Sequence, residues 1–193
     1  DEKSEKLILE LARGQARDEL GEAKKAEQEY ASAKLLLSKA MDQFTDPDTR
    51  AHAEYLLGTL TMEEADNTPD AETRETRYRA ALSRFLKVTG SYPQTLHASK
   101  AQYRIATVYE RLKEPDIAAQ EYVKLAYKYP DSEFLATPMA RLGTHFLKKA
   151  AAYEERAKPL LARAEEDKDA AFEGKALQKM AVREYLKTAS IFG

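Results

Sequence analysis

Small and aromatic residues recur along this chain at the spacing of amphipathic helices. The clearest stretch begins at Ala106, and Ala118 follows twelve residues later. Tyr122 comes four residues after Ala118, and Pro130 comes eight after Tyr122. Residues four apart share one face of a helix, and proline cannot continue a helix. The pattern therefore predicts two helices that pack closely at their small residues, followed by a turn.

The same intervals recur elsewhere, with two insertions. Ala81 follows Gly58 by 23 residues, and Ala181 follows Gly143 by 38, instead of the twelve of the regular copy. We expect a neighbouring helix to press against the small residues of each copy, which are Gly14, Gly58, Ala106 and Gly143 on the first helices and Ala26, Ala81, Ala118 and Ala181 on the second. The aromatic residues expected in the core are Tyr30, Phe85, Tyr122 and Tyr185.

Local signals set the expected helix boundaries. The predicted helices cover residues 4–20, 22–44, 48–66, 70–90, 95–112, 115–129, 137–158 and 169–191. Asp46-Pro47-Asp48 is expected as a break with a helix cap, and Thr95 and Thr137 are expected as N-caps, because short polar side chains accept hydrogen bonds from the first helical amides. Pro115 suits a first turn. Pro159 either kinks a long helix or begins a short one.

This spacing resembles the tetratricopeptide repeat (TPR), a helix-turn-helix unit of roughly 34 residues. The resemblance implies an all-α fold, a right-handed superhelical solenoid of about four TPR-like helical hairpins. Long inserted helices are expected in the second and fourth hairpins. The repeats would cover residues 7–44, 51–93, 99–132 and 136–190 of a single domain spanning 1–193.

Two tyrosine-proline turns narrow the resemblance. They are Tyr92-Pro93 and Tyr129-Pro130, and the first precedes the sequence Ala-Gln-Tyr-Arg-Ile-Ala-Thr-Val-Tyr at 101–109. These features are similar to bacterial cell-envelope repeat proteins, such as the outer-membrane assembly lipoproteins of the barrel-assembly machinery and the Tol-Pal-associated periplasmic coordinators. The resemblance implies a periplasmic or outer-membrane-associated scaffold, with the cytoplasm as the alternative.

Composition excludes several classes of function. The chain has 33 acidic and 31 basic residues and a net charge of −2, so it lacks the basic excess typical of nucleic-acid-binding proteins. It has no cysteine, which excludes thiol catalysis, disulfides and cysteine-based zinc sites. No apolar run approaches the roughly 18 residues of a transmembrane segment.

No constellation of residues predicts catalysis, and we expect no enzyme activity, cofactor or metal site. His52, His97 and His145 fall on three different repeats, so they are expected as separate surface or boundary residues. Neighbouring carboxylates such as Glu63-Glu64 and Glu154-Glu155 point in different directions on a helix and are expected in solvent. The chain has no phosphate-cradling glycine loop and no nucleophile motif.

The TPR resemblance implies where a partner would bind, because the first helices of such repeats line the concave surface. The matching positions form the candidate partner-binding groove: His52, Tyr55, Thr59, Met62, Lys100, Tyr103, Arg104, Thr107, Glu110, Arg111, Arg141, Thr144 and Lys148. Arginine and tyrosine are frequent anchors of interfaces. The basic members of the set, Lys100, Arg104, Arg111, Arg141 and Lys148, leave an acidic peptide or helix open as one kind of partner.

We therefore predict a non-enzymatic scaffold that binds a partner peptide or helix in this groove. One alternative is an amphipathic edge that binds nothing. Another is a structural or oligomerisation segment of a larger multidomain protein, in which the helices around 137–191 pack on a second copy or on another domain.

Overall fold

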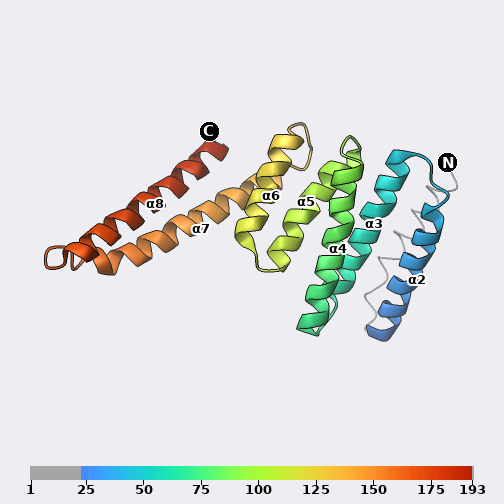
Figure 1. Ribbon diagram of the computed structural model, residues 1–193, viewed down its shortest axis with the longest axis horizontal. Helices are drawn as coiled ribbons and strands as arrows, with labels where there is room; N and C mark the ends of the chain where they lie inside the picture. Colours follow the sequence, from blue (N-terminus) through green and yellow to red (C-terminus); the bar gives the residue numbers. More distant parts are fainter. Residues whose placement is uncertain (1–22, 193) are drawn as a thin grey trace. The chain divides into compact units, whose positions relative to one another are not determined.

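The computed structural model describes residues 23–192, and that part of the chain contains helices and no strands (Figure 1). The helices are α2 (Ala23–Met41), α3 (Pro47–Asp66), α4 (Ala71–Ser91), α5 (Leu96–Arg111), α6 (Pro115–Lys128), α7 (Ala136–Leu161) and α8 (Lys168–Phe192). The predicted all-α fold is confirmed. The helix expected at 4–20, with Gly14, lies outside the described residues.

The contacts divide the chain into two compact units, with the boundary between Ser132 and Glu133. In the first unit α2 packs on α3, and the antiparallel pairs α3–α4 and α5–α6 form two TPR-like hairpins (Figure 1). The second unit is the long antiparallel hairpin of α7 and α8. The expectation of a single domain over 1–193 stays a prediction.

The helix starts follow from capping. The Asp46 carboxylate accepts hydrogen bonds from the amide and the hydroxyl of Thr49, at 2.8 and 2.9 Å, and these bonds lower the pKa of Asp46. Asp70 caps α4 by accepting from the amide of Thr73 at 2.8 Å. Each carboxylate satisfies an amide that has no partner within the helix.

Two of the other expected boundaries differ in detail. Thr95 occupies the N-cap position of α5, but its hydroxyl donates to the carbonyl of Tyr92 at 2.9 Å and caps no helical amide. The prediction for Thr137 is wrong: α7 begins at Ala136, with Leu135 in the cap position, so Thr137 lies inside the first turn.

The inserted residues lengthen helices instead of loops. The helices α3 and α4 have 20 and 21 residues and are joined by the short turn 67–70. The helices α7 and α8 have 26 and 25 residues. Of the two alternatives for Pro159, the structure has one long helix, because α7 continues past this residue to Leu161.

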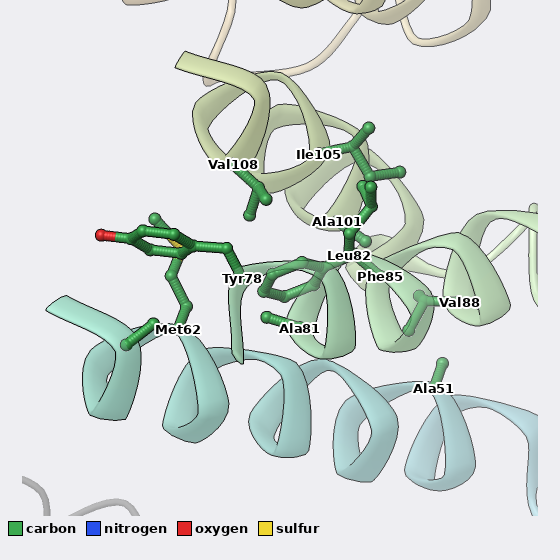
Figure 2. Packing of buried hydrophobic residues seen from close by; sticks show 11 residues of the cluster. Ala51, Met62, Tyr78, Ala81, Leu82, Phe85, Val88, Ala101, Ile105 and Val108 are labelled. Carbon is green, nitrogen blue, oxygen red and sulfur yellow. The ribbon is translucent and has the colours of Figure 1, made fainter. Parts of the chain in front are cut away.

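The core of the first unit forms where helices meet at small residues. A Cβ atom added to Gly58 of α3 would lie 2.7 Å from Cε1 of Phe85 on α4, so any larger residue there would force the ring or the helices to move. Phe85 is fully buried, and residues of α5 such as Ile105 complete the cluster (Figure 2). The predicted close approach at Gly58 is confirmed. Burial of Tyr30, Phe85 and Tyr122 is confirmed as well.

The prediction that Tyr185 belongs to the core is wrong. This residue is 38% exposed, and its hydroxyl donates to Glu154 of α7 at 3.0 Å. The hairpin of the second unit closes on small buried residues, which are Ala150, Ala157, Gly174 and Ala181. A Cβ atom on Gly174 would come within 2.9 Å of the Leu161 side chain. Tyr185 follows the buried Ala181 by one helical turn and stays partly exposed, with its hydroxyl bonded to Glu154.

Candidate partner-binding face

The two hairpins of the first unit present equivalent side chains on α3 and α5. Tyr55 and Thr59 on α3 match Tyr103 and Thr107 on α5. In both pairs the threonine hydroxyl donates to the tyrosine carbonyl one turn earlier, at 3.0 and 3.1 Å. We call the surface along these helices the α3–α5 face, made of His52, Tyr55, Lys100, Tyr103, Arg104, Thr107, Glu110 and Arg111.

Side chains from α3 and α5 meet directly on this face. Nε of Arg104 donates a hydrogen bond to the hydroxyl oxygen of Tyr55 at 3.3 Å. The rings of His52 and His97 stack with centroids 4.2 Å apart and an interplanar angle of 9°. The Tyr55 ring lies 5.9 Å from that of His97. The expectation that the three histidines are separate is therefore wrong for two of them, because α3 and α5 are neighbours in space.

His97 is neutral at physiological pH. Burial lowers the pKa of His97 to about 4, and the charges of His52 and Lys100 contribute to this shift. Nδ1 of His97 is buried and has no hydrogen-bond partner within the described part of the chain. Among residues 23–192, no three side chains of the metal-binding types come together. His52 and His97 therefore form a packed aromatic contact between α3 and α5.

The charge of the face is mixed. Nε of Arg111 lies 3.3 Å from the carboxylate of Asp66, which also accepts a 2.5 Å hydrogen bond from the Tyr78 hydroxyl. Burial and the hydrogen bond to Asp66 raise the pKa of Tyr78 to about 12. Arg111 is thus partly neutralised, and Lys100 and Arg104 are the other cations of the face.

The remaining candidate residues lie elsewhere. Met62 is 4% exposed and belongs to the core cluster beside Tyr78, so it offers a partner almost no surface (Figure 2). Thr59 is also buried. The last three candidates are exposed positions of α7 in the second unit: Arg141, Thr144 and Lys148.

Sequence reasoning missed a set of buried polar residues under the helices. Glu54 of α3 is fully buried and accepts a hydrogen bond from Nη1 of Arg84 at 3.0 Å and another from Lys87. At the equivalent position of α5, buried Gln102 donates to the carboxylate of Glu121 at 2.8 Å. The sequence did contain a signal for these buried residues, because Glu54 and Gln102 occupy the same position of their repeats, each directly after an alanine that is buried.

Glu64 corrects a further expectation. It was expected in solvent with Glu63, yet it is 8% exposed. Its carboxylate forms ion pairs with Lys34 of α2 and, at 3.4 Å, with Arg77 of α4. Glu64 therefore links three helices of the first unit.

Paired antiparallel helices that meet at small residues define a TPR-like helical-repeat protein, and the comparisons with known proteins agree with this class. The model of the YfiO family, described as outer membrane lipoprotein, matches residues 13–124. This match covers more than half of the chain, and the chain belongs to that cell-envelope family. Searches of curated proteins and of solved structures gave no match. No helix within 23–192 is long and apolar enough to cross a membrane.

Proposed function

We propose that this protein is a non-enzymatic scaffold of the bacterial envelope that binds a peptide or helix of a partner protein on the α3–α5 face. The observation that carries the proposal is the alignment of half-buried anchors from two consecutive repeats, joined by the hydrogen bond from Arg104 to Tyr55. Tyrosine and arginine dominate the energy of many interfaces. Side chains held on rigid helices lose little entropy on binding.

The chemistry of the face suggests the kind of partner. The rings of Tyr55 and Tyr103 supply apolar surface, while Lys100 and Arg104 supply positive charge beside them. A segment with an apolar side chain next to a carboxylate complements this arrangement. The family's place at the outer membrane supports a partner on the periplasmic side.

Co-purification from the source cell envelope tests the proposal. The double variant Tyr103→Ala, Arg104→Glu alters the face, and Tyr127→Ala, Lys128→Glu is a matched control on the exposed end of α6. We expect a partner that is retained by the wild type and the control but lost by the face variant, with the helical content of all three unchanged. A partner held equally by all three proteins would overturn the assignment.

The alternative of a structural or oligomerisation segment predicts a different result. No envelope partner would be found, and light scattering would show a wild-type oligomer that the Tyr103→Ala, Arg104→Glu variant leaves intact. That combination would favour self-association through another surface.

A further inference from the structure

The second unit carries a groove of its own, outside the segment matched by the family model. It runs between α7 and α8 and has a volume of about 870 Å³. We call it the α7–α8 groove; its lining residues that carry the argument are Ala157, Leu161 and Val182, which are apolar, and Lys175, Lys179 and Arg183, which are basic. An apolar floor beside several cations is a surface for an amphipathic, acidic ligand.

The three basic residues of α8 that line the groove form no ion pair within the described part of the chain. Lys175, Lys179 and Arg183 follow one another at intervals of one helical turn. Like charges at this spacing repel one another. The one carboxylate in the lining, Glu154, accepts a hydrogen bond from the Tyr185 hydroxyl. The groove therefore presents a row of three cations on α8 against a single carboxylate in its lining.

Apolar side chains continue the same face of α8. Lys175, Lys179, Val182 and Leu186 are spaced so that they lie along one side of the helix. Val182 is 55% exposed and Leu186 is 65% exposed. Exposed apolar residues next to a groove usually mark an interaction surface.

We propose that the α7–α8 groove binds an amphipathic helix of a partner protein, with carboxylates at one-turn intervals along the edge of its apolar stripe. A helix fits because α7 and α8 run antiparallel for 26 and 25 residues (Figure 1), and residues from both helices line the groove. Carboxylates one turn apart would each face one of the three cations of α8 that line the groove, Lys175, Lys179 and Arg183.

Two other occupants fit less well. A second copy of this chain that docked through the same groove would bring the rows of Lys175, Lys179 and Arg183 towards each other. A flat anionic membrane would meet the exposed cations, but it would leave the apolar floor at Ala157 uncovered. This site is separate from the α3–α5 face, and its test is independent of the function proposed above.

Two synthetic helical peptides with the same apolar stripe, one bearing glutamates at its edges and the other lysines, test the proposal on the full chain. Lys175→Glu, Lys179→Glu is the groove variant. Arg156→Glu, Arg163→Glu makes the same change of charge at exposed positions of the same unit outside the groove lining. Fluorescence anisotropy of the labelled peptides reports binding.

We expect the wild type to bind the glutamate peptide and to discriminate against the lysine peptide. The groove variant should bind the glutamate peptide about tenfold more weakly and gain affinity for the lysine peptide, whereas the control should match the wild type. Equal binding of both peptides by the wild type, no binding of the glutamate peptide, or an equal loss in the control would overturn the proposal. Two further results would overturn the proposal. In each, the wild type fails to bind the glutamate peptide but binds phosphatidylglycerol vesicles or forms a dimer, and the groove variant loses that vesicle binding or dimerisation.

Discussion

Arg104 of α5 donates a hydrogen bond from Nε to the hydroxyl oxygen of Tyr55 on α3, across 49 positions of the sequence and over 3.3 Å. The bond joins the first helices of two consecutive repeats, so it fixes the relative position of two predicted anchors. The same tyrosine packs with its ring 5.8 Å from Phe85 in the core. Tyr55 therefore connects the α3–α5 face to the interior of the first unit.

Substitutions at Tyr55 separate these two roles. Tyr55→Phe removes only a long, partly exposed hydrogen bond, and we expect the free energy of unfolding to fall by less than about 1 kcal/mol. Tyr55→Ala also removes the ring contacts with Phe85 and His97, and we expect a loss of about 2–4 kcal/mol. Urea unfolding followed by circular dichroism measures both. Similar losses for the two variants would contradict the proposed packing role of the ring.

The contact between Gly58 and Phe85 predicts that a single added methyl group is harmful. In Gly58→Ala, the new Cβ would approach the buried Phe85 ring to 2.7 Å. Such overpacking costs about 1–3 kcal/mol, while alanine gains up to about 1 kcal/mol in helix propensity. We expect a net loss of about 1–2 kcal/mol in thermal or urea unfolding.

Gly90 is the matched control because a Cβ atom added there meets nothing within 4 Å. Gly90→Ala should leave stability unchanged or raise it by less than about 1 kcal/mol. If Gly58→Ala were as stable as Gly90→Ala, the close approach of α3 and α4 at this point would be wrong.

The spacing of small and aromatic residues was enough to predict this contact and most of the helices, because these features are local or repeat from one hairpin to the next. The sequence predicted the pairing of α3 with α4 through Gly58 and Ala81. It did not predict the exposure of Tyr185, since that depends on which residues of α8 face α7, and Ala181 is buried there while Tyr185 stays partly exposed. A helical period shows which face is apolar and leaves the separation of the helices open.

Buried Glu54 predicts an asymmetry between two kinds of variant. In Glu54→Gln the cations Arg84 and Lys87 lose their carboxylate, but both are already partly exposed and remain solvated by water. We therefore expect the free energy of unfolding to fall by about 1 kcal/mol. The double variant Arg84→Ala, Lys87→Ala removes both partners and leaves the Glu54 carboxylate buried without a cation. We expect its free energy of unfolding to fall by about 3 kcal/mol. Urea unfolding at neutral pH compares the two. As a control, Lys158→Ala breaks a fully exposed pair with Glu155 and should cause no measurable change.

His97 predicts a pH dependence of stability. Its pKa is about 4 in the folded chain against an ordinary value of 6.5, so the unfolded chain takes up a proton first as the pH falls. The contribution of neutral His97 to the free energy of unfolding should therefore be fully present above about pH 6.5 and be lost as the pH drops towards 4. Below pH 4, His97 should cause no further change. Because His97 is only half buried, we expect a total effect of about 1–2 kcal/mol.

The variant His97→Phe keeps a ring against His52 and removes the titrating group. Urea unfolding between pH 7 and pH 4 should show a shallower decline in this variant than in the wild type. Gly90→Ala should keep the wild-type slope. An unchanged slope in His97→Phe would show that His97 is not the group responsible.

The candidate site was predictable only in part. Matching positions of the repeat identified Tyr55, Tyr103 and Arg104, since helical phase alone places them on one side of α3 and α5. The stacking of His52 on His97 was missed because it requires knowing that the two helices touch. Met62 was included because its phase is right, although the added length of α3 and α4 covers it.

Site-specific photocrosslinking tests the central claim most directly. A photoreactive phenylalanine analogue replaces Tyr103 on the α3–α5 face or, as the control, Tyr127 on α6, which is 87% exposed. The protein is produced in its native envelope, irradiated and examined for covalent adducts. We predict a discrete protein adduct from position 103 that is absent at position 127 and is lost when Arg104→Glu is added. An adduct from position 127 with none from position 103 would contradict binding on this face.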